Sequence, residues 1–246
     1  MFPTMKNLVR SLAIIAMLLS TAGSLSAQKR ATGSMNLETF DFRPYHFGFL
    51  LSWNTSSFFI DRRADFSFSD SLLSISNVPQ AGFNLALLAS LNLTKNVNFR
   101  FIPGLSFQDR GLDYKFLKAD GTTEHFLKRT ESVWLEFPVL CKLRTDRVKN
   151  FDAYALIGAT YALDMQSQKD VNNEVASDII VKLVDRNYTV DAGAGVDFYL
   201  PYFKFAIEMK TCIGLPDVLL HEDHRFATPI SKLRTRTFVM SFTFEG

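Results

Sequence analysis

The sequence predicts an all-β fold: an eight-stranded antiparallel up-and-down transmembrane β-barrel with four long extracellular loops and three short periplasmic turns. Three observations support this. Apolar and polar residues alternate over segments of about ten residues, long and short connections follow one another in turn, and the chain opens like a secretory signal peptide. Hydrophobic residues make up 47% of the chain. Yet no apolar run after the N-terminus reaches the roughly 18 residues that a membrane-spanning helix requires.

The alternation is clearest in residues 97–108, where Phe99 and Phe101 lie on one face and Asn98 and Arg100 on the other. A period of two is the signature of a β-strand with one apolar face. The predicted outward residues of the first and last strands are Phe47, Phe49, Leu51, Trp53, Phe238, Met240, Phe242 and Phe244. The eight predicted strands are residues 45–54, 81–93, 97–108, 130–143, 152–165, 190–200, 203–215 and 235–245.

The connections between these strands alternate in length. The long polar ones are residues 55–80, 109–129, 166–189 and 216–234, and the short ones are 94–96, 144–151 and 201–202. Outer-membrane barrels show this pattern, with loops outside the cell and turns in the periplasm. An even number of strands places both termini on the periplasmic side. Within the third loop, residues 178–184 either extend the sixth strand or form a helical turn.

A soluble barrel or sandwich also alternates with a period of two, but with its apolar face inward. Three features favour the membrane: the signal peptide, the alternating loop lengths and the aromatic ladder that reaches Phe244. Glycines on the polar face suit a narrow lumen, because opposite walls must approach closely. The predicted location is therefore the outer membrane, with outer-membrane lipid as the surrounding solvent.

The N-terminal segment has the three parts of a secretory signal. Lys6 and Arg10 form a positive region, residues 12–19 a short apolar core, and small residues follow, with cleavage after Ala27 or, alternatively, Ala22. The predicted organisation is a signal peptide at 1–27, a periplasmic arm at 28–44 and the barrel at 45–246. The formal net charge of +2 gives no reason to expect a nucleic-acid partner.

The polar face places nine charged residues inside the predicted lumen. An unpaired charge in a narrow lumen would cost several kcal/mol of desolvation free energy. We therefore expect these residues to form an ion-pair network that fills and stiffens the barrel. An ion pathway or proton relay is the alternative. For Glu208, chain proximity offers Lys204 and Lys210 as partners. The nine are Arg100, Glu136, Lys142, Asp164, Asp191, Asp197, Lys204, Glu208 and Lys210.

No catalytic, cofactor or metal site is expected. The loop sequence His221-Glu222-Asp223-His224 resembles a metal cluster, but adjacent ligands cannot close around one ion unaided, so a solvated loop tip is favoured. His46 has no evident acid or nucleophile partner, and no serine lies in GxSxG. No small-molecule substrate is predicted either.

The two cysteines are predicted to stay unlinked. Cys141 lies on the lipid face near the end of its strand, and Cys212 lies on the opposite parity, in the lumen. A disulfide requires Cα atoms within about 7 Å and side chains that point together. Residues on opposite faces of a wall do not meet that requirement, so two shielded free thiols are expected.

Four segments carry a family resemblance: residues 135–142 (LEFPVLCK), 154–158, 193–198 (GAGVDF) and 214–219 (GLPDVL). They resemble the PorT/SprT group, a family of outer-membrane β-barrel proteins of Bacteroidota. Cys141 departs from the aliphatic residue expected there. The resemblance spans most of the chain after the signal peptide and implies participation in type IX protein secretion, in some members coupled to gliding motility.

On that resemblance the leading expectation is a non-enzymatic component of the type IX secretion and gliding machinery, acting through protein–protein contacts with other secretion proteins. A narrow closed barrel would assist a translocon and could not pass folded cargo itself. Two alternatives stay open. One is a generic outer-membrane barrel for adhesion or envelope stability, and the other a lipid-modifying barrel enzyme.

Overall fold

The structure is a computed structural model, and it describes residues 35–63, 72–118, 120–166, 182–221 and 226–246. The predicted signal peptide and both candidate cleavage positions lie outside these residues. The described part of the chain contains no helix that is long and apolar enough to cross a membrane.

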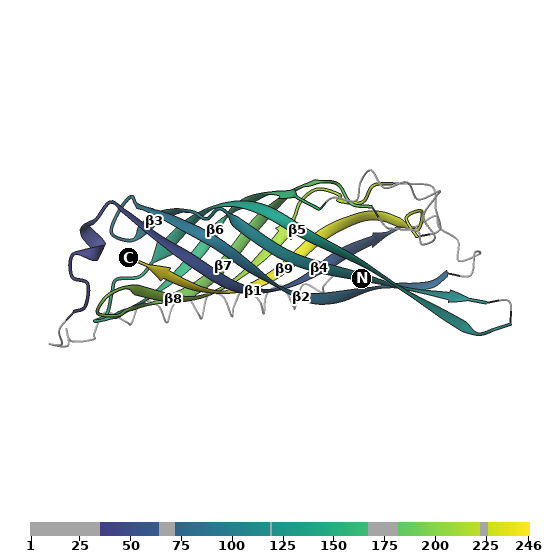
Figure 1. Ribbon diagram of the computed structural model, residues 1–246, viewed down its shortest axis with the longest axis horizontal. Helices are drawn as coiled ribbons and strands as arrows, with labels where there is room; N and C mark the ends of the chain where they lie inside the picture. The colour runs from purple at the N-terminus through teal and green to yellow at the C-terminus, as the bar shows by residue number, and fades with distance from the viewer. Residues whose placement is uncertain (1–34, 64–71, 119, 167–181, 222–225) are drawn as a thin grey trace, which may run out of the picture. The chain divides into compact units, whose positions relative to one another are not determined.

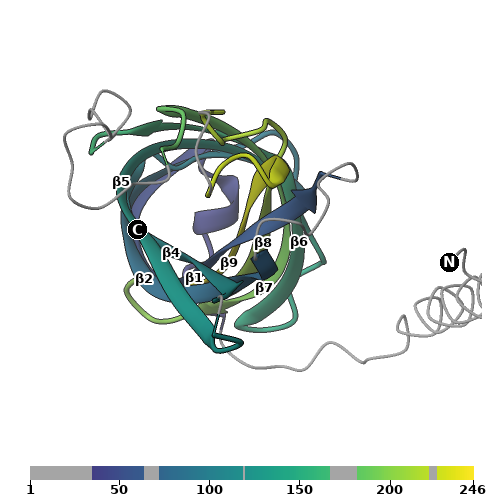
Figure 2. The same ribbon diagram turned by 90° about the vertical axis from the view of Figure 1, so that its right-hand side faces the viewer.

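The described residues form one antiparallel sheet that closes on itself (Figures 1 and 2). Strand β1 pairs with β2 on one side and with β9 on the other, so the ring has no free edge. The strands are β1 (Tyr45–Arg62), β2 (Leu72–Asn92), β3 (Val97–Phe101), β4 (Gly104–Leu117), β5 (Thr123–Arg144), β6 (Phe151–Asp164), β7 (Arg186–Tyr199), β8 (Lys204–Gly214) and β9 (Ile230–Glu245).

Strands β3 and β4 occupy a single position in the ring, which makes the barrel eight-stranded, as predicted. Both pair with β2 and with β5, and the register runs unbroken from Phe101 opposite Val139 to Gly104 opposite Glu136. The interruption falls at Pro103 and opposite Pro138. Proline has no N–H to donate to the ladder, so the hydrogen-bond pattern breaks while the strand continues.

The end of the barrel that carries Tyr45 and Glu245 also carries the short connections 93–96, 145–150 and 200–203, and is called the turn end. The opposite end, the loop end, carries the connections 63–71, 118–122, 165–185 and 215–229, of which all but 118–122 are longer than those of the turn end. A single-turn 3-10 helix, η2 (Phe40–Phe42), precedes β1 at the turn end (Figure 1).

The strands extend further toward the loop end than predicted, which corrects two of the expected loops. Much of 55–80 belongs to β1 and β2, and most of 109–129 forms a hairpin in which Leu117 pairs with Thr123. Two features explain why the alternation in the sequence did not predict these extensions. The β2–β4 register shifts between Pro79 and Phe83, which disturbs strict alternation. In addition, the apolar face changes sides.

Toward the turn end, the apolar residues face outward, as predicted. Phe47, Phe49, Leu51 and Trp53 of β1 are all exposed, while Ser52 and its even-numbered neighbours are buried. Strand β9 repeats the pattern with Phe238 exposed and Ser241 buried. This arrangement is the one that lipid as the outer solvent requires.

Toward the loop end, apolar residues face inward and form the largest buried cluster. Leu183 pairs with Leu219 in an isolated bridge, so two loops enter the mouth of the barrel. Of the ambiguous stretch 178–184, residues 178–181 lie outside the described part, and the rest forms neither strand nor helix. The cluster comprises Phe58, Leu72, Ile75, Leu112, Tyr114, Leu183, Val218, Leu219, Phe226, Ala227, Ile230 and Leu233.

Candidate functional site: the barrel interior

An ion-pair network crosses the lumen near the turn end, and Arg100 of β3 is at its centre. The Arg100 guanidinium donates to Glu208 of β8 at 2.8 Å and to Glu245 of β9 at 3.4 Å. The side chains of Arg100 and Glu208 are 0% exposed. The Tyr154 hydroxyl also donates to Glu208, at 3.2 Å. A residue of one wall therefore holds two carboxylates of the opposite wall.

Two lysines extend this network. The ammonium group of Lys204 lies 2.7 Å from Glu245 and 3.7 Å from Asp197. Lys142 of β5 binds the same Asp197 carboxylate at 2.6 Å. With Arg100 and Glu208, the chain of contacts contains three cations and three carboxylates, so its formal charge is zero. Buried charges require this kind of pairing.

The network has five of the nine predicted lumen charges, and one member that the sequence reasoning missed. Glu245 is the missed member. It alternates in step with the lumen residues Ser241 and Thr243, and this alternation could have identified it as inward-facing. The expected partner of Glu208 was wrong: the structure pairs it with Arg100, which is distant in sequence, and not with Lys204 or Lys210. Chain proximity failed because Lys204, Glu208 and Lys210 lie beside one another on the same strand, while the ion pair reaches across the lumen to β3.

The other four predicted charges point inward but lie outside the network. Asp191 accepts hydrogen bonds from Thr160 at 2.5 Å and Thr189 at 2.6 Å. Glu136 accepts one from Gln108 at 2.8 Å, and Asp164 accepts the backbone N–H of Gln166. Among the described residues, none of these three carboxylates forms an ion pair within 4.0 Å. Lys210 likewise has none, and it lines a small cavity with Glu136.

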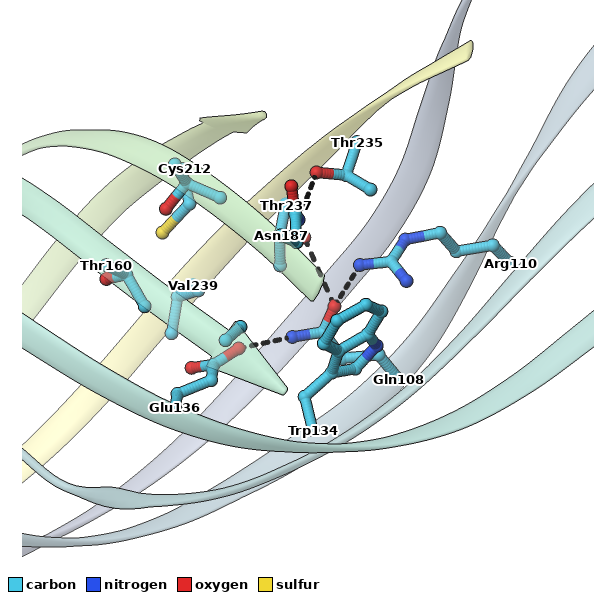
Figure 3. Close-up of a pocket in the computed structure, with 12 residues that line it drawn as sticks. Gln108, Arg110, Trp134, Glu136, Thr160, Asn187, Cys212, Thr235, Thr237 and Val239 are labelled. Carbon is cyan, nitrogen blue, oxygen red and sulfur yellow. Dashed lines mark hydrogen bonds between the residues drawn. The ribbon is translucent and has the colours of Figure 1, made fainter. Parts of the chain in front are cut away.

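Hydroxyl and amide side chains fill the middle of the lumen (Figure 3). Gln108 accepts from the Arg110 guanidinium and donates to Glu136, and Asn187 donates to Thr235 at 2.8 Å. The cavity that these side chains line measures about 20 Å³. Because one water needs roughly 10–15 Å³, the space suits a single water and no larger ligand.

Helix η2 closes the turn end of the lumen; Figure 2 shows it within the ring. Phe40 is buried and stacks on His46, with ring centroids 3.7 Å apart, and meets Tyr199 edge-on. The Asp41 carboxylate forms an ion pair with the Arg144 guanidinium at 2.7 Å. An aromatic contact and an ion pair thus fix the helix. His46 packs against this closure, and its Nε2 lies 3.1 Å from the Asn92 amide.

Gly195 allows the network to form. A Cβ atom at this position would lie 2.5 Å from the Tyr154 ring, so any larger residue would displace that ring. The same ring packs under the Lys142 ammonium, 3.7 Å from its centroid. Tyr154, Lys142, Gly195 and Asp197 all belong to the segments on which the family resemblance rests. Those segments therefore build the interior of the barrel.

The cysteines lie as predicted on opposite faces, and both are free. Cys212 lines the lumen cavity, while Cys141 alternates with buried Leu140 and Lys142 and so faces outward. Of the His221–His224 sequence, residues 222–224 lie outside the described part, and His221 pairs with Asp217 at 2.9 Å. The described residues contain no group of three or more His, Cys, Asp and Glu that could hold a metal ion.

A closed sheet with lipid-compatible residues outside and paired charges inside defines a membrane-spanning β-barrel. The family described as "Outer membrane protein beta-barrel domain" matches residues 26–220, well over half of the chain. The chain therefore belongs to this outer-membrane family. In such barrels the short turns lie in the periplasm and the longer loops outside the cell, so the turn end is periplasmic and the loop end extracellular.

Solved structures with a similar arrangement are distant in sequence. OprG from Pseudomonas aeruginosa is 11% identical, with a TM-score of 0.42 over 81% of this chain and 95% of its own. Ail, the attachment invasion locus protein of Yersinia pestis, is 11% identical, with a TM-score of 0.37 over 83% and 100%. Neisserial surface protein A is 11% identical, with a TM-score of 0.35 over 79% and 95%. A search of curated proteins finds no match.

Proposed function

We propose that this protein is a non-enzymatic outer-membrane component of the type IX secretion and gliding machinery, acting through contacts between its ends and other secretion proteins. Side chains fill the lumen at both ends, and this observation supports a protein that is not a channel. Phe40 occupies the periplasmic mouth and the apolar cluster around Tyr114 and Phe226 occupies the extracellular mouth. The described residues leave no path between them for a folded cargo or a substrate.

The type IX assignment rests on the resemblance to the PorT/SprT group. The four resembling segments lie on the adjacent strands β5, β6 and β7 and on the connection after β8. Three of them supply the residues around Lys142, Tyr154 and Asp197, so the resemblance concerns the interior that gives the barrel its shape. Partner recognition then falls to the residues at the two ends.

Exposed apolar side chains at the periplasmic end offer a contact surface. Phe42 of η2 is 87% exposed and Tyr202 of the turn after β7 is 89% exposed. Exposed aromatic residues are enriched where proteins bind one another. At the other end, Leu117 and Leu127 of the β4–β5 hairpin are exposed.

The test is the set of secreted proteins in a strain that lacks this gene. Loss of proteins with a C-terminal secretion signal from the medium, restored by the wild-type gene, is the expected result. A complementing gene with Phe42→Ser and Tyr202→Ser should fail to restore secretion if the periplasmic end makes the contact, while Leu117→Ser with Leu127→Ser should restore it. An unchanged secretome with increased envelope permeability would instead favour a generic barrel for envelope stability.

A further inference from the structure

The outward face of β9 changes chemistry along the strand. Starting from the periplasmic end, its outward residues are Phe244, Phe242, Met240 and Phe238. The next three outward residues, Arg236, Arg234 and Lys232, are all cationic and are called the β9 cation row. The intervening residues, such as Thr235 and Leu233, are buried in the barrel. One strand thus presents an apolar ladder and then three cations on the same surface.

Neighbouring side chains neutralise the β9 cation row only in part. Arg234 pairs with Asp61 of β1 at 3.2 Å, and its guanidinium lies 5.1 Å from the centroid of the Phe59 ring. Lys232 and Arg236 are exposed, and within the described ranges neither forms an ion pair within 4.0 Å. Among the described residues, the row therefore carries an excess of two positive charges on the outer surface.

The height of the row on the barrel determines what it meets. The apolar band of an outer-membrane barrel covers the hydrocarbon layer and ends in aromatic residues at each interface. The row follows directly after Phe238 toward the extracellular end, and the neighbouring outward residue on β8, Ile213, is exposed and apolar. Its cations therefore lie at the level of the headgroups of the outer leaflet.

The other side of the extracellular end shows no such excess. On the β4–β5 hairpin, the outward charges are Asp109, Asp113 and Glu131 together with Lys115 and Arg129. Acids outnumber bases by one there, so this face carries no positive excess. The hairpin face therefore differs in charge from the β9 face, and it provides a matched control with two outward cations of its own.

We propose that the β9 cation row binds the phosphate groups of lipopolysaccharide, the glycolipid of the outer leaflet, with its acyl chains lying against Phe238 and Ile213. Unpaired cations beside an apolar surface complement a lipid that carries phosphates above hydrocarbon chains. This inference rests on membership in an outer-membrane family and on the charge of one surface, and it does not depend on the proposed role in secretion.

The experiment measures binding of purified lipopolysaccharide to the mature protein folded in detergent. Each cation near an anionic lipid surface contributes about fivefold in affinity. The variant with Lys232→Gln and Arg236→Gln should therefore bind about 25-fold more weakly. The control with Lys115→Gln and Arg129→Gln should bind like the wild type. Altered mobility on unboiled gels verifies folding, and if the double variant does not fold, the two single variants, each expected about fivefold weaker, replace it.

Two further arms identify the source of the phosphate. Lipopolysaccharide stripped of its phosphates should bind wild type and double variant equally weakly, and inorganic phosphate at matched concentration should not compete. Equal affinity of wild type and double variant for intact lipopolysaccharide would overturn the proposal. So would full competition by inorganic phosphate, because the row would then be a site for free anions.

Discussion

The two ends of this barrel bury opposite kinds of side chain. Within the membrane-spanning part, Trp53 faces outward and Glu208 faces the lumen. In the extracellular extension, Leu112 and Tyr114 face inward, while Asp113 and Lys115 face outward. Both regions alternate with a period of two along continuous strands. The same strands are thus surrounded by lipid in one region and by water in the other. The polarity of their two faces reverses at the boundary between lipid and water.

The reversal changes what stabilises each region. In water, burial of apolar surface contributes roughly 25 cal/mol per Å², so the cluster around Tyr114 and Phe226 favours the folded extension. Within lipid, moving an apolar side chain from the outer wall into the protein interior brings no comparable gain, because both surroundings are free of water. The stability of the membrane-spanning part therefore depends on the lumen. There, each polar group that is removed from water must form a hydrogen bond or an ion pair. Arg100 satisfies that requirement through a contact across the barrel, and Asp197 through Lys142, two strands away in the ring.

The largest effect should come from breaking the lumen network. Arg100→Met leaves Glu208 and Glu245 without their central cation, and loss of one partner of a buried pair typically costs about 3–5 kcal/mol of unfolding free energy. The urea midpoint in detergent micelles should fall accordingly. Adding Glu208→Gln should recover part of the loss, because one stranded charge is removed.

The matched control for that experiment is an ion pair on the surface. Lys95 and Asp146 pair at 2.9 Å but are largely exposed, so Lys95→Gln should leave the midpoint unchanged within error. If Arg100→Met behaved like this control, the network would be solvated by water, and the account of the lumen would be wrong.

The second effect separates the two regions. Leu112→Ala should cost about 2–3 kcal/mol through the cavity it leaves, and the damage should be local to the extracellular end. Hydrogen exchange should accelerate in the β4–β5 hairpin and not in the segments of β8 and β9 near Glu208. The outward substitution Lys115→Ala is the control. Equal acceleration throughout the barrel would show that the two regions do not differ in this way.

A third, smaller effect tests the fit between strands β6 and β7. Gly195→Ala should cost about 1–3 kcal/mol, because the added methyl group displaces the Tyr154 ring. In a Tyr154→Leu background the same substitution should cost much less, since the ring is absent. Equal costs in both backgrounds would mean that Gly195 is required for some other reason.

The comparison also explains what could be predicted from the sequence. The strands of the membrane-spanning part were predictable, because Phe99 and Phe101 alternate with Asn98 and Arg100 and the pattern repeats around the ring. The extensions were not, because the reversal of polarity ends the expected pattern near Thr55 and Asp109 although pairing continues. Local pattern identifies a face only while the outer solvent stays the same.

For the candidate site, the inward direction of the charges was predictable and the pairing was not. Parity places Lys142, Asp197 and Glu208 inside the barrel from the sequence alone. The partner of each depends on the diameter and register of the closed ring, which bring β3 opposite β8 and β9. Those quantities come from the complete set of strand pairings, so Arg100 and Glu245 could not be matched to Glu208 and Lys204 in advance.

The two tryptophans allow the central claim, that lipid faces the outer wall and not the lumen, to be measured directly. Trp53 is 62% exposed on the outer face, and Trp134 is 2% exposed inside the lumen. In vesicles of lipid with brominated acyl chains, protein with Trp134→Phe, which keeps only Trp53, should lose most of its fluorescence. Protein with Trp53→Phe, which keeps only Trp134, should retain most of it. Strong quenching of Trp134 with little quenching of Trp53 would contradict the orientation of the wall and the account built on it.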